Sequence, residues 1–184
     1  MAKKTVKKPA AQDRKELLKY IQLAIDTEKR GIKFYTEAKK QVDDINMTML
    51  MDVLLEQEQI HLKFFTEVYN AEKKEGEGEA AAKAGEYEAQ PPVKNPLFKT
   101  KDLQEVTKKK STIYHLFNQA VEFEQKGHDL YMDLAKKINN KKISKFLKMV
   151  ATEELKHKDF IHMHQDAIYS TGYWFGMEHV RLET

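Results

Sequence analysis

Apolar residues recur along four long stretches of the chain at alternating steps of three and four positions. An α-helix has about 3.6 residues per turn, so this spacing places the apolar side chains on one face of a helix. We therefore predict four amphipathic helices near residues 13–42, 46–73, 112–139 and 141–168. Strand-like alternation of apolar and polar residues is hard to find, so the expected fold class is all-α.

The two halves of the chain repeat each other at an offset of 96 positions. The chemically informative pairs at this offset are Glu28 and Glu124, Gly31 and Gly127, Tyr35 and Tyr131, Glu58 and Glu154, and His61 and His157. A duplicated helical hairpin explains such a repeat. Short turns at residues 43–46 and 139–140, rich in Asp and Asn, make the two helices of each hairpin antiparallel neighbours.

Residues 74–111, between the hairpins, have the composition of a linker, with a Glu-Gly repeat and three prolines. This linker must travel the length of the bundle, so we predict a four-helix bundle with one long crossover. The bundle is expected to span residues 13–168. Residues 1–12 form a predicted disordered basic tail, and residues 169–184 form an aromatic C-terminal tail.

Composition excludes several classes of function. The sequence contains no Cys, which excludes disulfides, thiolate-held iron–sulfur clusters and a rubredoxin-type iron site. The net charge of +3 includes four Lys in residues 1–12, which leaves −1 for the rest of the chain, so no nucleic-acid partner is predicted. No stretch resembles a signal peptide or a membrane span. A cytoplasmic protein without a membrane partner is expected.

Four glutamates occupy positions on the predicted helix faces where the pattern requires an apolar residue. They are Glu28, Glu58, Glu124 and Glu154, one on each helix. Each uncompensated charge buried in a core costs several kcal/mol, whereas two divalent cations balance four carboxylates. The alternative is a set of ordinary ion pairs between helices. It lacks support because no matching set of Lys or Arg occupies the facing positions.

Two of these glutamates are followed one helical turn later by a histidine, as Glu58-x-x-His61 and Glu154-x-x-His157. A Glu from each of two helices plus a Glu-x-x-His from each of the other two is the ligand set of a carboxylate-bridged dinuclear site. Oxygen-rich ligation with two imidazoles favours iron or manganese over structural zinc or copper. We predict two bound iron ions, with manganese or a mixed pair as the alternative.

The segments Ala24 to Tyr35 and Leu54 to His61 resemble the first two helices of rubrerythrin-like proteins of the ferritin-like superfamily. The second half repeats these segments, and the resemblance covers about residues 16–168. It implies a ferritin-like fold in which Glu58 and Glu154 bridge the metals. The resemblance also implies that Glu28 and Glu124 are terminal ligands, and that His61 and His157 each complete the coordination of one metal.

Three further residues are candidates near the site. The resemblance implies that Tyr35 and Tyr131 lie near the metals, and plain core packing with a hydrogen-bonded hydroxyl is the alternative. His128 lies one turn after Glu124 and is a candidate for an extra ligand or a base, with a histidine at the edge of the core as the alternative.

The resemblance also implies an activity, because rubrerythrins reduce hydrogen peroxide with electrons from a rubredoxin-type centre. Without Cys, this chain would need an external donor, either rubredoxin or a reductase. Gly127 stands where typical rubrerythrins have a further Glu, which brings the ligand set closer to the ferroxidase sites of bacterioferritins. The leading hypothesis is a homodimeric oxidoreductase acting on hydrogen peroxide or dioxygen. The alternatives are a ferroxidase and a structural or binding protein stabilised by its metals.

Overall fold

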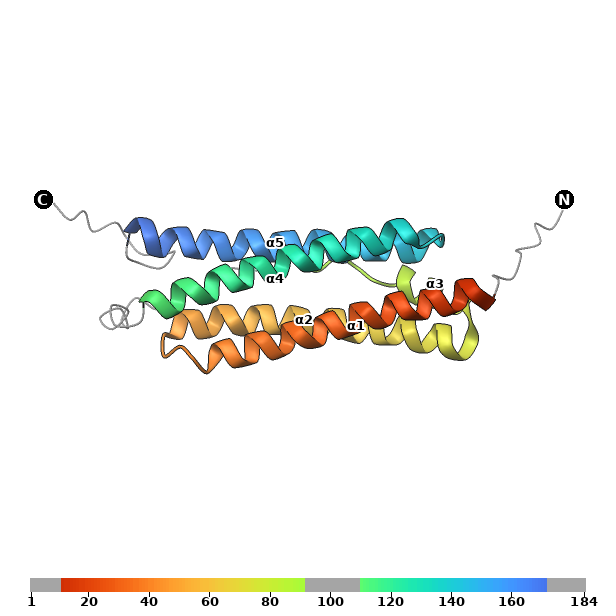
Figure 1. The fold of residues 1–184 in the computed structure, drawn as a ribbon, viewed down its shortest axis with the longest axis horizontal. Coiled ribbons are helices and arrows are strands. Elements are labelled where there is room, and N and C mark those ends of the chain that lie inside the picture. Colours follow the sequence, from red (N-terminus) through yellow and green to blue (C-terminus); the bar gives the residue numbers. More distant parts are fainter. Residues whose placement is uncertain (1–10, 92–109, 172–184) are drawn as a thin grey trace, which may run out of the picture.

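The structure of the protein is a computed structural model that describes residues 11–91 and 110–171. Its helices are α1 (Ala11–Lys39), α2 (Ile45–Glu75), α3 (Glu77–Gly85), α4 (Lys110–Lys137) and α5 (Lys141–Thr171). The described ranges contain no strand. The four long helices lie along a common axis (Figure 1), which confirms the all-α, ferritin-like bundle. Most of the predicted tails, residues 1–12 and 169–184, lies outside the described residues, and only residues 11–12 and 169–171 are described, as ends of α1 and α5.

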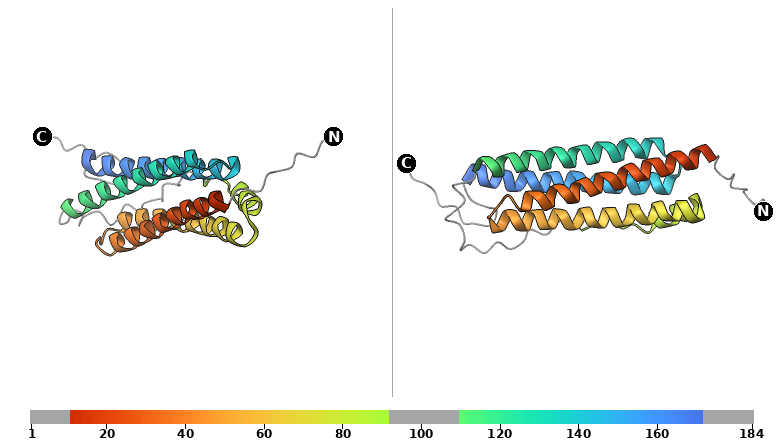
Figure 2. Two further views of the ribbon diagram at one scale, coloured as in Figure 1. Left: turned by 45° about the vertical axis from the view of Figure 1, so that its right-hand side comes forward. Right: turned by 60° about the horizontal axis from the view of Figure 1, so that its bottom comes forward.

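The helices form two hairpins, α1 with α2 and α4 with α5, which lie side by side in each view (Figure 2). Asp44 caps α2, because its side chain accepts a hydrogen bond from the Met47 amide at 2.9 Å. Asn140 caps α5 through hydrogen bonds from the amides of Lys142 and Ile143 at 3.0 and 3.3 Å. These contacts confirm the turn and capping roles predicted for both interhelical segments.

The helix limits agree with the predicted ones to within three residues. The helix α1 ends at Lys39 rather than near Val42, and α2 continues to Glu75. Gly76 then ends α2 with φ 95°, a conformation that residues with a Cβ rarely adopt, and its amide reaches the carbonyls of Ala71 and Glu72. The chain can therefore reverse direction immediately after α2.

The crossover contains the short helix α3, which the sequence analysis did not predict. The helix α3 packs against both α2 and α5 at one end of the bundle (Figure 1). The small side chains of Ala80, Ala81 and Ala84 are buried, and Tyr87 follows them into the core with only 4% of its surface exposed. Alanines favour the helix, and their small size permits close packing against two neighbouring helices. The first part of the crossover thus belongs to the packed core.

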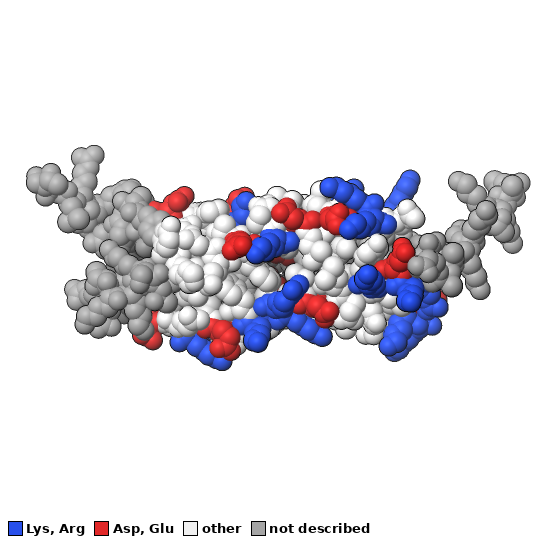
Figure 3. All heavy atoms as spheres, in the orientation of Figure 1, with Lys and Arg blue, Asp and Glu red and all other residues white. Residues whose placement is uncertain are grey.

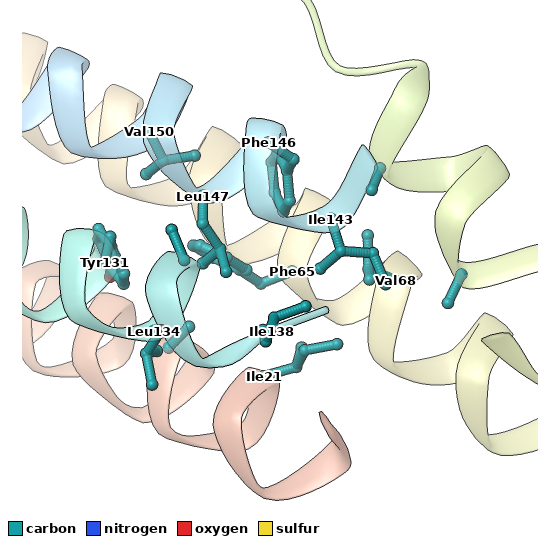
Figure 4. Close-up of a cluster of buried hydrophobic side chains, with 14 of the residues drawn as sticks. Ile21, Phe65, Val68, Tyr131, Leu134, Ile138, Ile143, Phe146, Leu147 and Val150 are labelled. Carbon is teal, nitrogen blue, oxygen red and sulfur yellow. The ribbon is translucent and has the colours of Figure 1, made fainter. Parts of the chain in front are cut away.

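Two separate hydrophobic clusters fill the bundle. One includes Ile21, Phe65, Tyr131 and Leu147 and lies at the end nearer α3 (Figure 4). The other fills the opposite end and includes Met47, Leu54, Ile113, Phe117 and Ile161. On every long helix, the predicted glutamate ligand lies between residues of the first cluster and residues of the second. The carboxylates therefore occupy a polar layer between two apolar ones.

The surface carries mixed charge. Lysine and arginine side chains alternate with aspartate and glutamate over the face drawn in Figure 3, in keeping with the near-neutral body of the chain. Among the described residues, no helix combines the length and the apolar character that a membrane crossing requires.

Candidate metal centre

The six predicted ligands meet in the polar layer at the middle of the bundle. Their side chains come from all four long helices, and each residue has at most 2% of its surface exposed: Glu28, Glu58, His61, Glu124, Glu154 and His157. Potential ligand atoms converge in two groups, in each of which all atoms lie within 4.8 Å of one another. One group contains Glu28, His61 and Glu154, and the other contains Glu58, Glu124, Glu154 and His157. Glu154 belongs to both groups, as expected of a bridging ligand.

Both histidines point Nδ1 at the carboxylates. Nδ1 of His61 lies 3.3 Å from Glu154 and 3.7 Å from Glu28, and Nδ1 of His157 lies 3.4 Å from Glu124 and 3.3 Å from Glu154. The two rings are nearly stacked, with centroids 5.7 Å apart. This arrangement leaves the Nε2 atoms free to contact groups outside the cluster. In a metal-bound histidine, a hydrogen bond donated by one ring nitrogen usually determines that the other nitrogen binds the metal.

Several atoms of the cluster have no hydrogen-bond partner within the described structure although they are fully buried. These atoms are Oε2 of Glu28, Oε1 of Glu58, Nδ1 of His61 and Oε2 of Glu124. Buried polar atoms nearly always have a partner, so such a concentration of unpaired acceptors at one point needs an explanation. Divalent cations supply it, because carboxylate oxygen and imidazole nitrogen are the donors that iron and manganese bind. The residues present therefore fit a metal centre.

The pKa values of the metal-free cluster are strongly shifted. Burial, followed by repulsion from neighbouring carboxylates, raises the pKa of Glu58 well above its usual value and that of Glu124 to about 8. Burial opposes protonation of His157, yet the adjacent carboxylates of Glu124 and Glu154 raise its pKa to about 9. Burial also opposes ionisation of Glu154, but the close approach of both histidines lowers its pKa. At neutral pH, without metal, Glu124 and His157 therefore hold protons on atoms that would bind metal ions.

Metal binding at pH 7 is consequently expected to release protons. Glu124 and His157, with pKa values of about 8 and about 9, are protonated at this pH in the metal-free state, and each must lose its proton to coordinate a cation. The sign follows from the raised pKa values, so apparent affinity should increase as pH rises toward 9. A pH indicator in weakly buffered, anaerobic solution measures the release when Fe²⁺ is added. Metal uptake without proton release would contradict the assigned protonation states.

The two predicted tyrosines connect opposite halves of the repeat. The Tyr35 hydroxyl of α1 donates to Oε1 of Glu124 on α4, and the Tyr131 hydroxyl of α4 donates to Oε1 of Glu28 on α1. Both rings are fully buried. Burial, followed by the charge of the bonded glutamate, raises the pKa of each tyrosine, so both hydroxyls remain protonated. Each tyrosine thus orients a carboxylate of the partner hairpin.

His128 lies outside both groups of converging atoms. Its Nδ1 lies 2.8 Å from the carbonyl oxygen of Ala151 on α5, so this nitrogen carries the proton and donates to the backbone. The contact fixes a partly buried side chain between α4 and α5. The structure thus favours the reading of His128 as a histidine at the edge of the core.

The repeat-related glycines have different surroundings. A Cβ on Gly31 would lie 2.8 Å from both Cδ of Glu58 and Cε1 of Phe123, and closer still to the Glu58 carboxylate. A Cβ on Gly127 would meet Cγ of Glu154 at 3.5 Å, which is an ordinary contact. Position 31, beside Glu58, therefore requires glycine, whereas position 127, beside Glu154, does not.

Sequence analysis missed one carboxylate of the site, Glu153. It has 2% of its surface exposed, and its Oε2 lies 2.9 Å from Nε2 of His61. The residue next to a ligand on a helix points about 100° away from it, so Glu153 does not lie on the stripe that identified Glu154. The sequence carried no signal for it, because a position about 100° from the buried stripe can equally face solvent.

Comparison with protein families matches the chain to Rubrerythrin over residues 19–124 and 115–182. Comparisons with curated proteins and with solved structures found no significant match. Each matched segment contains ligands of the buried cluster, and the cluster together with the family fits a di-iron protein. The match spans most of the chain, and the chain belongs to the rubrerythrin family.

Proposed function

We propose that this protein is an oxidoreductase that reduces hydrogen peroxide at a di-iron centre with electrons from an external donor. The observation that carries the proposal is the buried cluster of four carboxylates and two histidines, whose inward atoms lack hydrogen-bond partners among the described residues. Four carboxylates balance two divalent ions, so the centre would be close to neutral inside an apolar bundle.

The grouping of ligand atoms supports a division of roles. Glu28 and His61 would hold one ion, Glu124 and His157 would hold the other, and Glu154 would bridge them. Glu58 converges with the second group and has an unpaired oxygen, which fits the second bridge expected of it.

Bound as a ferrous pair, the metal would supply one electron from each ion to hydrogen peroxide, which takes up two protons and becomes two water molecules. The protein contributes the surroundings. Tyr35 and Tyr131 hold the outer oxygens of Glu124 and Glu28, so these carboxylates stay directed at the metals. Both tyrosine hydroxyls also stay protonated, so they hold protons within the buried layer. The hydrophobic clusters on both sides exclude bulk water.

The electron donor is proposed to be a separate protein, either rubredoxin or a reductase. A chain without Cys cannot hold an iron–thiolate centre of its own. A cytoplasmic homodimer is the form in which we expect this protein to meet its donor.

Oxidation of Fe²⁺ as a substrate is the second candidate. Gly127 favours it, because this position lacks the further carboxylate implied by the resemblance to typical rubrerythrins. The two candidates differ in stoichiometry. A ferroxidase oxidises many equivalents of added Fe²⁺ per chain under air, whereas the proposed peroxidase stops after its resident pair unless a donor is present.

Stopped-flow mixing tests the proposal. The anaerobic, iron-loaded protein should be oxidised faster by peroxide than by air, with one peroxide consumed per two electrons. Continued turnover should require an added reductase or rubredoxin. The variant Glu154→Ala should bind less iron and lose the reaction because it removes the shared ligand, whereas Glu122→Ala, at an exposed position of α4, should change neither. A loaded protein that reacts with neither oxidant would leave only a structural role for the metals.

A further inference from the structure

Glu153 is held by three donors from two segments of the chain. Its Oε2 accepts hydrogen bonds from Nε2 of His61 on α2 and from the hydroxyl of Tyr87, and its Oε1 accepts one from the Gln90 amide at 2.7 Å. Tyr87 and Gln90 belong to the crossover that follows α3. A carboxylate with three donors has its position fixed, because rotation about its side-chain bonds would break at least one of them.

This carboxylate determines which nitrogen of His61 can bind a metal. Because the Glu153 oxygen accepts a hydrogen bond from Nε2, the neutral ring that metal binding requires keeps its proton on Nε2. Its lone pair is then on Nδ1, the atom that faces Glu28 and Glu154. The orientation of His61 is therefore controlled from outside the ligand set.

Tyr87 is itself rigidly placed. Its ring packs edge-to-face against Phe64 of α2 and Phe146 of α5, with centroids 4.9 Å away in both cases. Phe146 lies at the end of the bundle where α3 packs, as Figure 4 shows. Burial raises the pKa of Tyr87, so its hydroxyl stays protonated and can only donate to Glu153. The ring thus connects the packing of the crossover to the hydroxyl that holds Glu153.

The second half of the centre has no equivalent contact. The repeat places Gln57 at the position that corresponds to Glu153, 96 residues earlier. Gln57 is a neutral amide, and its Oε1 is buried without a hydrogen-bond partner in the described ranges. No described carboxylate contacts Nε2 of His157. The duplicated ligand set is symmetric, but the groups behind its two histidines are not.

We propose that Tyr87 is a positioning residue of the metal centre, which acts through Glu153 on His61 and so makes metal binding on the His61 side depend on the docked crossover. Metal binding on the His157 side does not depend on it. The proposal rests on the metal centre and is independent of which oxidant the centre reduces.

Zinc binding to Tyr87→Phe tests the proposal on the full-length protein. Phenylalanine keeps the ring contacts and removes only the hydroxyl. Competition with a chromophoric chelator should resolve two binding steps, one of which weakens by roughly 10-fold, the lower end of the range for groups behind a metal ligand. In the zinc-loaded, ¹⁵N-histidine-labelled protein, the Nε2–H signal of His61 should shift or exchange faster, while that of His157 stays unchanged. The control variant is Tyr69→Phe, because Tyr69 is partly buried and packs against the hydrophobic cluster that contains Tyr87. This variant should leave both zinc-binding steps unchanged.

A double-mutant cycle with Glu153→Gln distinguishes positioning from general loosening. If Tyr87 acts through Glu153, the double variant binds zinc no more weakly than Glu153→Gln alone. Three outcomes would overturn the proposal while leaving the metal centre intact. They are equal weakening of both zinc-binding steps, fully additive losses of zinc affinity in the double variant, and an unchanged His61 signal in Tyr87→Phe. A wild-type chain that binds no zinc would overturn the metal centre and this inference together.

Discussion

Replacing the four buried glutamates with glutamine is expected to raise the melting temperature of the metal-free protein and to abolish metal binding. The substitutions are Glu28→Gln, Glu58→Gln, Glu124→Gln and Glu154→Gln. Without metal, the wild-type core holds carboxylates whose charges burial and mutual repulsion penalise. Replacement of a buried ion pair by hydrophobic residues of similar volume is often stabilising, by about 1–4 kcal/mol, and removal of the four buried charges should act in the same direction. For a chain of this size, each kcal/mol shifts the melting temperature by about 2–4 °C.

Glutamine suits these positions because it keeps the acceptor that the buried tyrosines use. The hydroxyls of Tyr35 and Tyr131 each donate to one oxygen of a glutamate, and the amide oxygen of glutamine can accept the same bond. With metal bound, the wild type should instead melt at a higher temperature than the quadruple variant. Binding to the folded state alone adds about 4 kcal/mol when free metal exceeds its dissociation constant by about a thousandfold.

Thermal unfolding with chelator and with anaerobic Fe²⁺ measures both effects. A matched control replaces four exposed glutamates with glutamine, at Glu37, Glu56, Glu88 and Glu122. This control should keep its metal-dependent increase in melting temperature. A wild type that melts at one temperature with and without metal would show that the buried carboxylates do not form a metal centre.

Alanine at Gly31 is expected to damage the metal centre, whereas alanine at Gly127 is expected to stabilise the protein. The new Cβ at Gly31 would overlap the Glu58 carboxylate and the Phe123 ring, so Glu58 must leave its position between the hairpins. Overpacking of this kind costs about 1–3 kcal/mol. Loss of the Glu58 oxygens should also lower metal affinity. At Gly127 the Cβ meets only ordinary contacts, and alanine gains about 1 kcal/mol of helix propensity.

Denaturant unfolding and metal analysis of the two variants provide a comparison within one protein. Both substitutions add the same methyl group to repeat-related positions of long helices, so differences in intrinsic propensity cancel. Gly31→Ala should bind less iron than wild type, and Gly127→Ala should bind the same amount with a higher unfolding midpoint. Equal behaviour of the two variants would contradict the asymmetry of the site.

The sequence by itself determined the fold class, the duplication and the set of side chains that meet in the core. Helical periodicity is a local property, so the spacing of residues such as Leu17, Ile21 and Ala24 is enough to identify the buried face of α1. The same spacing placed Glu28 on that face. Once two hairpins are stacked, the faces can only meet one another, and the structure brings the six predicted side chains together.

Only the tertiary structure decided how the site is supported. The contacts of Tyr35 with Glu124 and of Tyr131 with Glu28 depend on the offset between hairpins, which no spacing within a helix specifies. The crossover has no periodic pattern, so neither α3 nor the approach of Tyr87 to Glu153 was predictable. Gly31 and Gly127 are equivalent in the repeat but differ in surroundings, because each faces side chains from elements packed against it. Local spacing encodes which face is buried, whereas packing between elements decides what each buried group touches.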